Sequence, residues 1–337
     1  MEVTELKKTD KNVKLNLLKG FACIGVVFAH ITFPGLFGQI VTCAAECTIH
    51  IFFMIAGYYA YGKKEDVIKR RLIKIVKIFL YAFILFFLFR LAFSIKNHEG
   101  IQWLSESFNW KTPLMYICFC TIDFAVPLWY LIAMIETYIV WLFVVKSQKE
   151  QLVLKITPIL FLLQILLTSY CETMQLVWFW KINFLTRAMP WFMLGYYLNS
   201  EKAQRARAIK TSTLTVMAII GCTIAEIPTV FDLSLKFSVI GYIPYAFGLF
   251  CLALKNPSKS ICHPIEFIGD KLSLNIYIFH VLMDGVISFV FSTILHVNTD
   301  SDLFLWSRPI IVLTATILAS YVVYKSLERF TSIPVTG

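Results

Sequence analysis

Charged side chains are scarce in this sequence. They make up 15% of its 337 residues, whereas soluble proteins contain about 25%. Hydrophobic side chains reach 58%, aromatic side chains reach 16%, and the mean hydropathy is +0.71. This composition excludes a water-soluble domain, and its abundance of apolar side chains also excludes intrinsic disorder. Since one membrane crossing needs about 20 apolar residues, the chain is long enough for about ten membrane-spanning helices.

Metal-binding and disulfide patterns are also lacking, although the chain has nine cysteines. Cys118 and Cys120 form a C-x-C pair without the second ligand pair that a zinc site requires. Other cysteines fall inside apolar runs, where a thiol behaves as a small hydrophobic side chain: Cys23, Cys43, Cys47, Cys222 and Cys251. We therefore expect no metal and no disulfide framework.

Long, continuous apolar runs occur at ten places. They cover residues 15–31, 40–61, 72–95, 127–145, 152–170, 184–198, 213–227, 236–254, 272–295 and 304–324. Because the runs are continuous rather than alternating, they exclude a closed barrel and predict an all-α integral membrane protein with about ten transmembrane helices. We expect the stretch 97–122 to be an interfacial or re-entrant segment. No internal repeat or linker interrupts the pattern, which predicts a single domain over residues 1–337.

Positive charges are almost absent from every second loop. With the N-terminus in the cytoplasm, the inner segments contain 20 Lys and Arg residues and the outer segments contain three. The positive-inside rule predicts this asymmetry, so we expect both chain ends, including the short tail 1–14, in the cytoplasm. The basic tail resembles a signal peptide, but the lack of a small-residue cleavage site favours a retained first helix. The net charge of +10 is thus a topology signal and does not indicate nucleic-acid binding.

The first span carries two titratable side chains, Lys19 near its cytoplasmic end and His30 near its outer end. Eleven residues of helix separate them by about 16 Å and by about three turns, so both side chains point to one face. Lys19 either faces the inside of the bundle or extends to the inner headgroups. His30 is either functional or an interfacial histidine without a role.

Further titratable side chains lie within the spans, where each is costly and is therefore a functional candidate. Glu46 and His50 are four residues apart on one helix face, as a general base and its orienting carboxylate require. The alternative is a hydrogen-bonded pair that joins two helices. Glu136 lies midway along the fourth span, and its partner can come only from tertiary contacts.

Arg90 and Arg187 lie toward the outer face, where each either binds an anionic substrate group or contacts headgroup phosphates. His280 and Asp284 form another pair four residues apart, in the ninth span. Together, these side chains indicate a polar cavity within the bundle, which a purely structural membrane anchor does not need.

A basic stretch follows the second span and contains Arg70, Arg71 and Lys74. Cytoplasmic retention explains much of it. Clustered ammonium and guanidinium groups at the inner mouth of the bundle also suit a polyphosphate such as coenzyme A, and they attract anionic membrane lipid.

Six elements of the chain form an ordered series. They are Lys19 with His30, the segment 52–58, Arg71 with Lys74, the segment 127–131 followed by Glu136, the segment 272–280 and the segment 326–329. In this order they resemble the R-x10-H, F-F-x-I-S-G-F/Y, R-x-x-R, L-W-Y/F-L, L-S-x-x-I-Y-L-x-H and closing cytoplasmic elements of the acyltransferase-3 family of integral membrane O-acyltransferases. Two lysines replace arginines of the family pattern, which removes the bidentate geometry of a guanidinium, and Ala56 replaces a serine.

The resemblance implies a ten-helix, multi-pass enzyme of a bacterial plasma membrane, without the extracellular esterase domain that some members carry. It implies transfer of acetyl groups from cytoplasmic acetyl-CoA, a substrate rather than a permanently bound cofactor, to hydroxyls of a cell-surface polysaccharide or its lipid-linked precursor. We expect His30 to be the catalytic histidine, oriented by Glu136 or Glu46, with His50 as the competing candidate. The expected donor-binding residues are Lys19, Arg71, Lys74 and Arg70, and the expected substrate-binding residues are Arg90, Arg187, Trp129, Tyr130 and His280.

Two other functions stay open at this point. The membrane portions of certain serine racemases share the family pattern and are linked with amino acid transport, and the same buried Glu, His and Arg residues suit a proton-coupled translocation path. A polysaccharide flippase or polymerase is the second, although a polymerase would be expected to have longer outer loops than this chain. The oligomeric state is left open.

Overall fold

The computed structural model describes residues 12–332, so most of the predicted tail 1–14 and the last five residues lie outside the described part. Within that part the chain forms helices and short helical turns and no strand, which confirms the all-α prediction. Asn12 begins the first helix, because its side-chain oxygen accepts a hydrogen bond from the backbone N–H of Leu15 at 2.9 Å.

Ten helical units correspond to the ten predicted spans. Eight of them are single helices: α1 (Val13–His30), α2 (Gly35–Ala60), α3 (Glu65–Lys96), α6 (Trp129–Lys146), α7 (Glu150–Thr173), α10 (Thr211–Val230), α11 (Ser238–Ala253) and α14 (Asp302–Ser332). The ninth is α8 (Met189–Asn199), which follows the π-helical turn Phe184–Ala188. The tenth consists of α12 (His263–Phe267), the π-helical turn Ile268–Leu272, α13 (Ser273–Phe289) and the π-helical turn Val290–Ile294. In the described part, eight helical stretches are long and apolar enough to cross a membrane, and the two remaining units are the shorter α8 and α11.

Short helices make up the other described elements. The segment predicted to be interfacial or re-entrant forms α4 (Gly100–Ser107) and α5 (Thr112–Phe119), followed by the 3-10 turn η1 (Asp123–Leu128). Further short elements are the 3-10 turns Trp178–Lys181 and Glu201–Ala203 and the helix α9 (Gln204–Ala208). Neither α4 nor α5 contains a buried residue, so these two helices lie on the outside of the bundle, whereas Cys120 and Ile122, which follow α5, are buried.

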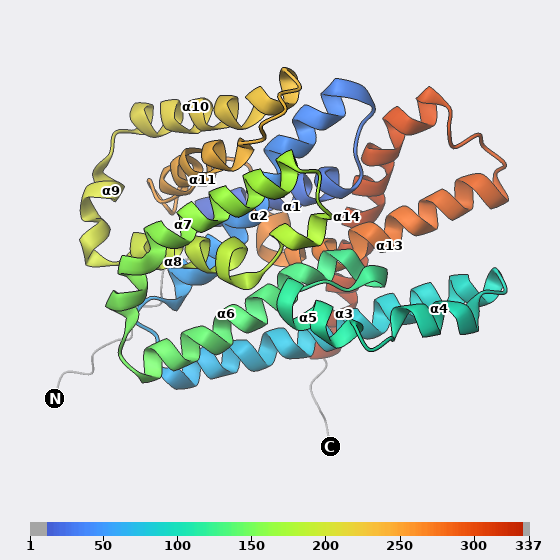
Figure 1. The fold of residues 1–337 in the computed structure, drawn as a ribbon, viewed down its shortest axis with the longest axis horizontal. Coiled ribbons are helices and arrows are strands. Elements are labelled where there is room, and N and C mark those ends of the chain that lie inside the picture. Colours follow the sequence, from blue (N-terminus) through green and yellow to red (C-terminus); the bar gives the residue numbers. More distant parts are fainter. Residues whose placement is uncertain (1–11, 333–337) are drawn as a thin grey trace.

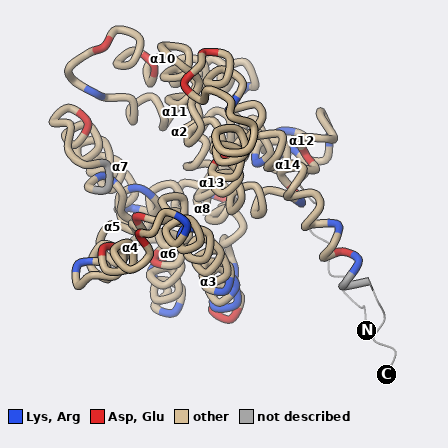
Figure 2. Tube along the Cα trace, turned by 90° about the vertical axis from the view of Figure 1, so that its right-hand side faces the viewer, with Lys and Arg blue, Asp and Glu red and all other residues tan. Residues whose placement is uncertain are grey.

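The spans pack in a stack in which α1, α2 and α8 lie between two outer pairs (Figure 1). The pair α10 and α11 lies at one edge, and the pair α3 and α6 lies at the opposite edge. Lys, Arg, Asp and Glu residues gather mainly near helix ends and in loops (Figure 2), as a membrane-spanning bundle requires. The inner and outer ends of the helices are those that the charge count predicts to face the cytoplasm and the exterior.

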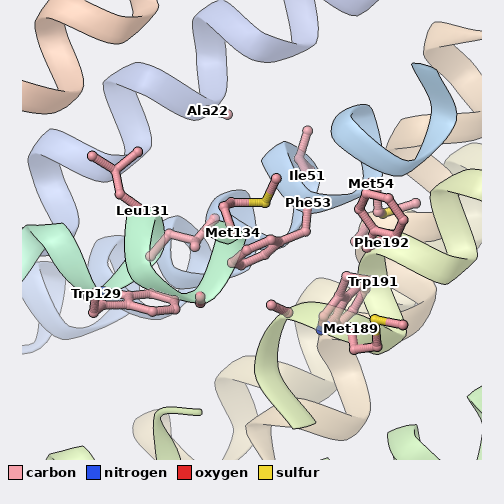
Figure 3. Packing of buried hydrophobic residues seen from close by; sticks show 14 of the residues in the cluster. Ala22, Ile51, Phe53, Met54, Trp129, Leu131, Met134, Met189, Trp191 and Phe192 are labelled. Carbon is pink, nitrogen blue, oxygen red and sulfur yellow. The ribbon is translucent and has the colours of Figure 1, made fainter. Parts of the chain in front are cut away.

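Small residues bring α2 and α8 into close contact. A Cβ atom added at Gly57 would lie 1.8 Å from the backbone oxygen of Phe192, and one added at Gly195 would lie 1.9 Å from that of Met54. The two backbones therefore cross at a distance that glycine alone permits, as is typical of helix pairs in membranes. Figure 3 shows the result: the side chains of Met54 on α2 and Phe192 on α8 lie beside each other.

The apolar interior of the bundle is continuous across these helices. Phe53 and Met54 on α2, Trp129 on α6 and Trp191 on α8 belong to one buried cluster, part of which appears in Figure 3. Many large apolar side chains of α3, α7 and α14 are instead exposed, Leu88 and Leu166 among them. Exposed apolar faces of this kind suit contact with lipid rather than with water.

Candidate functional site

One cavity follows a face of α1 through the interior of the bundle. It has a volume of about 200 Å³ and is called the α1 cavity here. On α1 it is lined by Lys19, Cys23, Val26 and His30, whose spacing matches successive turns of one helix face. Its other walls come from Ile49 and Phe52 on α2, Ile75 and Ile78 on α3, Pro127 before α6, Trp129, Tyr130, Leu131 and Met134 on α6, and Ser273, Leu274 and Tyr277 on α13.

Basic residues lie at the inner mouth of the α1 cavity. Arg71 and Lys74 are each one helical turn before a cavity-lining residue of α3, namely Ile75 and Ile78. The Lys74 side chain is exposed, while Arg71 is half-buried and lies against the hydroxyl of Tyr138. Half-buried Lys19 lines the cavity itself, and Arg71 and Lys74 lie one turn further inward on α3 than its lining residues.

Arg70 lies elsewhere on α3. Its guanidinium forms an exposed ion pair with Asp66, with 3.1 Å between Nη2 and the carboxylate oxygen. Because a neighbouring position on a helix faces another direction, this contact does not direct Arg70 to the cavity. Its donor-binding role stays a prediction.

Two histidines meet at the outer end of the α1 cavity. The ring centroids of His30 on α1 and His280 on α13 are 5.0 Å apart, with an interplanar angle of 49°. His30 is exposed, whereas His280 is fully buried. Tyr277, one turn before His280, lines the cavity and donates a hydrogen bond to the carbonyl oxygen of Pro127. The cavity therefore ends at an imidazole on the surface of the bundle.

A second, larger cavity opens at the outer ends of the helices. It has a volume of about 840 Å³ and is called the outer pocket here. The corner between α1 and α2 forms one wall, with residues from Thr32 to Gly38. Its other lining residues come from α2, α7, the Lys181 region, and the facing ends of α10 and α11. Two ion pairs line it, Glu172 with Lys181 at 2.5 Å and Asp232 with Lys236 at 3.5 Å.

The two cavities follow one another along α2. Gln39, Thr42 and Glu46 line the outer pocket, and Ile49 and Phe52 line the α1 cavity. These five residues are spaced three or four apart, so they form a single stripe along the helix. Glu46 is the last residue of this stripe that lines the outer pocket, one turn before the first that lines the α1 cavity.

Glu46 accepts a hydrogen bond from the Tyr242 hydroxyl at 3.3 Å. Its carboxylate is near enough to the His30 imidazole for an electrostatic interaction, although no hydrogen bond joins the two among the described residues. No lysine or arginine in the described part forms an ion pair with Glu46. It is therefore a carboxylate available to the contents of the outer pocket.

His50 belongs to a different network. Its ring stacks on Trp191, with centroids 4.2 Å apart, and its Nε2 lies 3.4 Å from the side-chain nitrogen of Gln164. Gln164 in turn accepts a hydrogen bond from Trp191 Nε1 at 3.0 Å, so its NH₂ group faces His50 as a donor. The carboxylate–imidazole pair expected from the spacing of Glu46 and His50 is not formed in the described part. The close packing of α2 on α8 directs His50 to Trp191.

Glu136 accepts a hydrogen bond from the thiol of Cys120 at 3.2 Å, and no histidine contacts it in the described part. The half-buried carboxylate therefore faces the end of α5 rather than the α1 cavity. Its expected role in orienting an imidazole stays a prediction.

Of the expected substrate-binding residues, three gather around the η1–α6 junction. Trp129 and Tyr130 line the α1 cavity. The guanidinium of Arg187 lies over the Trp129 ring at 5.3 Å, and its Nε atom is buried without a hydrogen-bond partner in the described part. Arg90 is exposed on α3 near its outer end and lines neither cavity, so its role in binding substrate stays a prediction.

Sequence reasoning missed several polar residues in the bundle. Tyr242 and Gln164 are uncharged at neutral pH, so a search for charged side chains does not find them, and Tyr277 lies in the segment 272–280 without a role assigned to it. Glu226 on α10 is charged, and both of its carboxylate oxygens are buried. Asp284 has a partner that its spacing from His280 did not indicate, the Arg308 guanidinium on α14.

These features define a multi-pass membrane protein whose helices enclose a path from a basic inner mouth to a histidine and an open pocket near the outer end. Over residues 12–325 the chain matches the model of a family described as an acyltransferase domain. The chain belongs to this acyltransferase-3 family, which confirms the resemblance found in the sequence. It is therefore a membrane acyltransferase with an acyl donor and an acyl acceptor as substrates. No curated protein and no solved structure matches the chain.

Proposed function

We propose that this protein is an O-acyltransferase that moves acetyl groups from cytoplasmic acetyl-CoA to a hydroxyl of a cell-surface polysaccharide or its lipid-linked precursor, in a bacterial plasma membrane. The observation that carries the proposal is the α1 cavity, which joins Lys19 near the inner mouth to His30 near the outer end. One face of α1 would then contact the donor at its inner end and the acceptor at its outer end.

The size of the α1 cavity supports a particular arrangement of the donor. A volume of about 200 Å³ is below the range of about 300–1,000 Å³ that encloses a whole cofactor or drug-sized ligand. It suits a narrow chain such as the thioester arm of acetyl-CoA. The phosphates of the donor remain at the inner mouth, where Lys19, Arg71 and Lys74 supply positive charge.

The proposed reaction takes place beside His30. One imidazole nitrogen takes up the proton of the sugar hydroxyl. At the same time, the hydroxyl oxygen attacks the thioester carbonyl carbon. A C–O bond forms, the C–S bond breaks, and the proton passes from His30 to the coenzyme A thiolate. General-base assistance of this kind contributes about 10²–10⁴-fold to a rate.

The outer pocket supports binding of the acceptor. Its lining combines hydroxyls, amides, carboxylates and paired lysines, which suit the many hydroxyl groups of a sugar. Its volume of about 840 Å³ leaves room for more than one sugar ring. Glu46 lies at the inner end of this lining, close to His30, where the reacting hydroxyl has to arrive.

The test compares cells that carry the wild-type chain with cells that carry His30→Ala or no chain. Mass spectrometry of the envelope glycans should show an acetyl ester only with the wild type, while both proteins reach the membrane in equal amounts. In addition, the purified protein in nanodiscs should transfer label from acetyl-CoA to the isolated glycan. Full acetylation by His30→Ala would remove His30 from the reaction.

The same preparation tests the transport alternative. Proteoliposomes without acyl-CoA should take up no labelled amino acid if the proposal holds. Two results together would overturn the acyltransfer proposal and support a translocation path. They are amino acid uptake that is lost in His30→Ala, and envelope glycans that are the same with and without the chain.

A further inference from the structure

The protonation of His280 follows from its contacts. Its Nδ1 lies 2.9 Å from the carbonyl oxygen of Tyr277 and 3.2 Å from that of Ile276. Carbonyl oxygens only accept hydrogen bonds, so Nδ1 must carry the hydrogen. A neutral imidazole has a single N–H, which leaves Nε2 of His280 as a bare acceptor.

This acceptor has no partner of its own. Nε2 of His280 is buried and makes no hydrogen bond in the described part of the chain. The ring beside it is that of His30, with centroids 5.0 Å apart. A buried acceptor requires a donor, and the neighbouring His30 ring can supply an N–H.

The two carboxylates that were expected to orient His30 form their hydrogen bonds with other residues. Glu136 accepts from the Cys120 thiol, and Glu46 accepts from the Tyr242 hydroxyl. No hydrogen bond connects either of them to His30 in the described part. A general base needs a third group that fixes its orientation and tautomer, and His280 is the residue in contact with it.

We propose that His280 is the positioning residue of the reaction, with its Nε2 accepting the N–H of His30 as the substrates bind. This hydrogen bond keeps the other nitrogen of His30 unprotonated and directed at the acceptor hydroxyl. When His30 takes up the hydroxyl proton, the same bond stabilises the imidazolium until the proton passes to the thiolate. The inference rests on the proposed acyl transfer.

Two substitutions separate this role from a structural one. In His280→Asn, the amide keeps a donor near the Nδ1 position and so retains the contact with the Tyr277 carbonyl, but it has no acceptor at the position of Nε2. In His280→Gln, the longer side chain returns an acceptor oxygen to that position and gives up the Nδ1 contact. The measurement is the rate of acetyl transfer by the purified protein in nanodiscs, with kcat and the KM for acetyl-CoA determined separately.

We expect His280→Asn to lower kcat by about tenfold or more, within the range of general-base effects, with an unchanged KM for acetyl-CoA. His280→Gln should retain most of the wild-type kcat, even if its thermal stability is lower. Full kcat in His280→Asn, or equal losses in both variants, would overturn the positioning role while leaving the acyltransferase assignment in place. Absence of transfer by the wild type would instead overturn the proposed function and, with it, the basis of this inference.

A second readout does not depend on activity. Nitrogen NMR of ¹⁵N-histidine-labelled protein should show one histidine locked with its hydrogen on Nδ1, and this signal should vanish in both His280 variants. The assignment of Nε2 as acceptor would be overturned if the wild-type spectrum showed no such Nδ1–H signal. It would also be overturned if the signal persisted in both variants.

Discussion

Lys19 and His30 line the same cavity from one face of α1, three helical turns apart. The rise of an α-helix places them about 16 Å from each other along the axis. A single rigid element thus connects the inner mouth of the bundle with the outer pocket region. The distance is too large for both side chains to contact the same small group, so the proposed reaction assigns them to different parts of the substrates.

The donor-binding role of Lys19 leads to a first prediction. Lys19→Ala should raise the KM for acetyl-CoA by about tenfold, the effect of losing one charge-assisted contact, with a smaller change in kcat. Lys19→Arg should retain the wild-type KM. Steady-state rates of the nanodisc protein measure both values. Lys210→Ala, an exposed lysine of an inner loop, is the control, and an equal KM in the two alanine variants would contradict the prediction.

Glu46 provides a second prediction, on the acceptor side. Glu46→Gln keeps the shape of the side chain and an acceptor for the Tyr242 hydroxyl, but it removes the negative charge from the inner end of the outer pocket. The KM for the glycan acceptor should rise about tenfold, and the KM for acetyl-CoA should stay constant. Asp232→Asn, which alters an exposed carboxylate on the same pocket, should have a smaller effect. A change confined to the donor KM would rule out an acceptor role.

The third prediction concerns the bidentate ion pair between α13 and α14. The Arg308 guanidinium donates to both carboxylate oxygens of Asp284, at 2.8 and 2.7 Å. Asp284→Asn should lower the free energy of unfolding by about 1–3 kcal/mol, because a charge-assisted pair between two helices is lost. Thermal unfolding in detergent checks this value.

The double variant Asp284→Asn, Arg308→Gln serves as the control for that pair. Its loss of stability should be smaller than the sum of the two single losses, because either single change already removes the interaction. Strictly additive losses would show that the two side chains stabilise the bundle independently.

Close helix packing gives a fourth prediction. In Gly195→Ala, the new Cβ would lie 1.9 Å from the backbone oxygen of Met54, so α2 and α8 must move apart. We expect a loss of about 1–3 kcal/mol in the free energy of unfolding. In the matched control Gly285→Ala, the nearest atom is the tip of the Phe89 ring at 2.9 Å, which can move aside. Equal melting temperatures of the two variants would contradict the proposed role of the α2–α8 crossing.

Most of the fold was predictable because its determinants are local. A run of apolar residues forms a helix wherever the solvent is lipid, since every backbone hydrogen bond must be satisfied within the segment. For this reason all ten predicted spans have a helical counterpart, and even the short sixth span 184–198 is present as Phe184–Ala188 with α8. The cytoplasmic position of the chain ends rests on the charge count and stays a prediction.

The candidate site was predictable only in part. Helical periodicity directs Lys19 and His30 to one face, and both line the α1 cavity. The same argument places Glu46 and His50 on one helix face, but the two side chains do not pair with each other. Tyr242 donates a hydrogen bond to Glu46, and Gln164 contacts His50. Glu136 likewise meets Cys120, which precedes it by 16 residues and lies beyond the end of α5.

By itself, the sequence determined that this protein is an all-α membrane protein, that a lysine and a histidine face one way along its first helix, and that it resembles the acyltransferase-3 family. These properties depend on composition, on the 3.6-residue turn of the helix and on motif order, which the chain carries without reference to its neighbours. Only the tertiary structure decided that His280, 250 residues further along, lies beside His30. Such pairing depends on how closely each helix approaches the next, and contacts between distant side chains fix that approach.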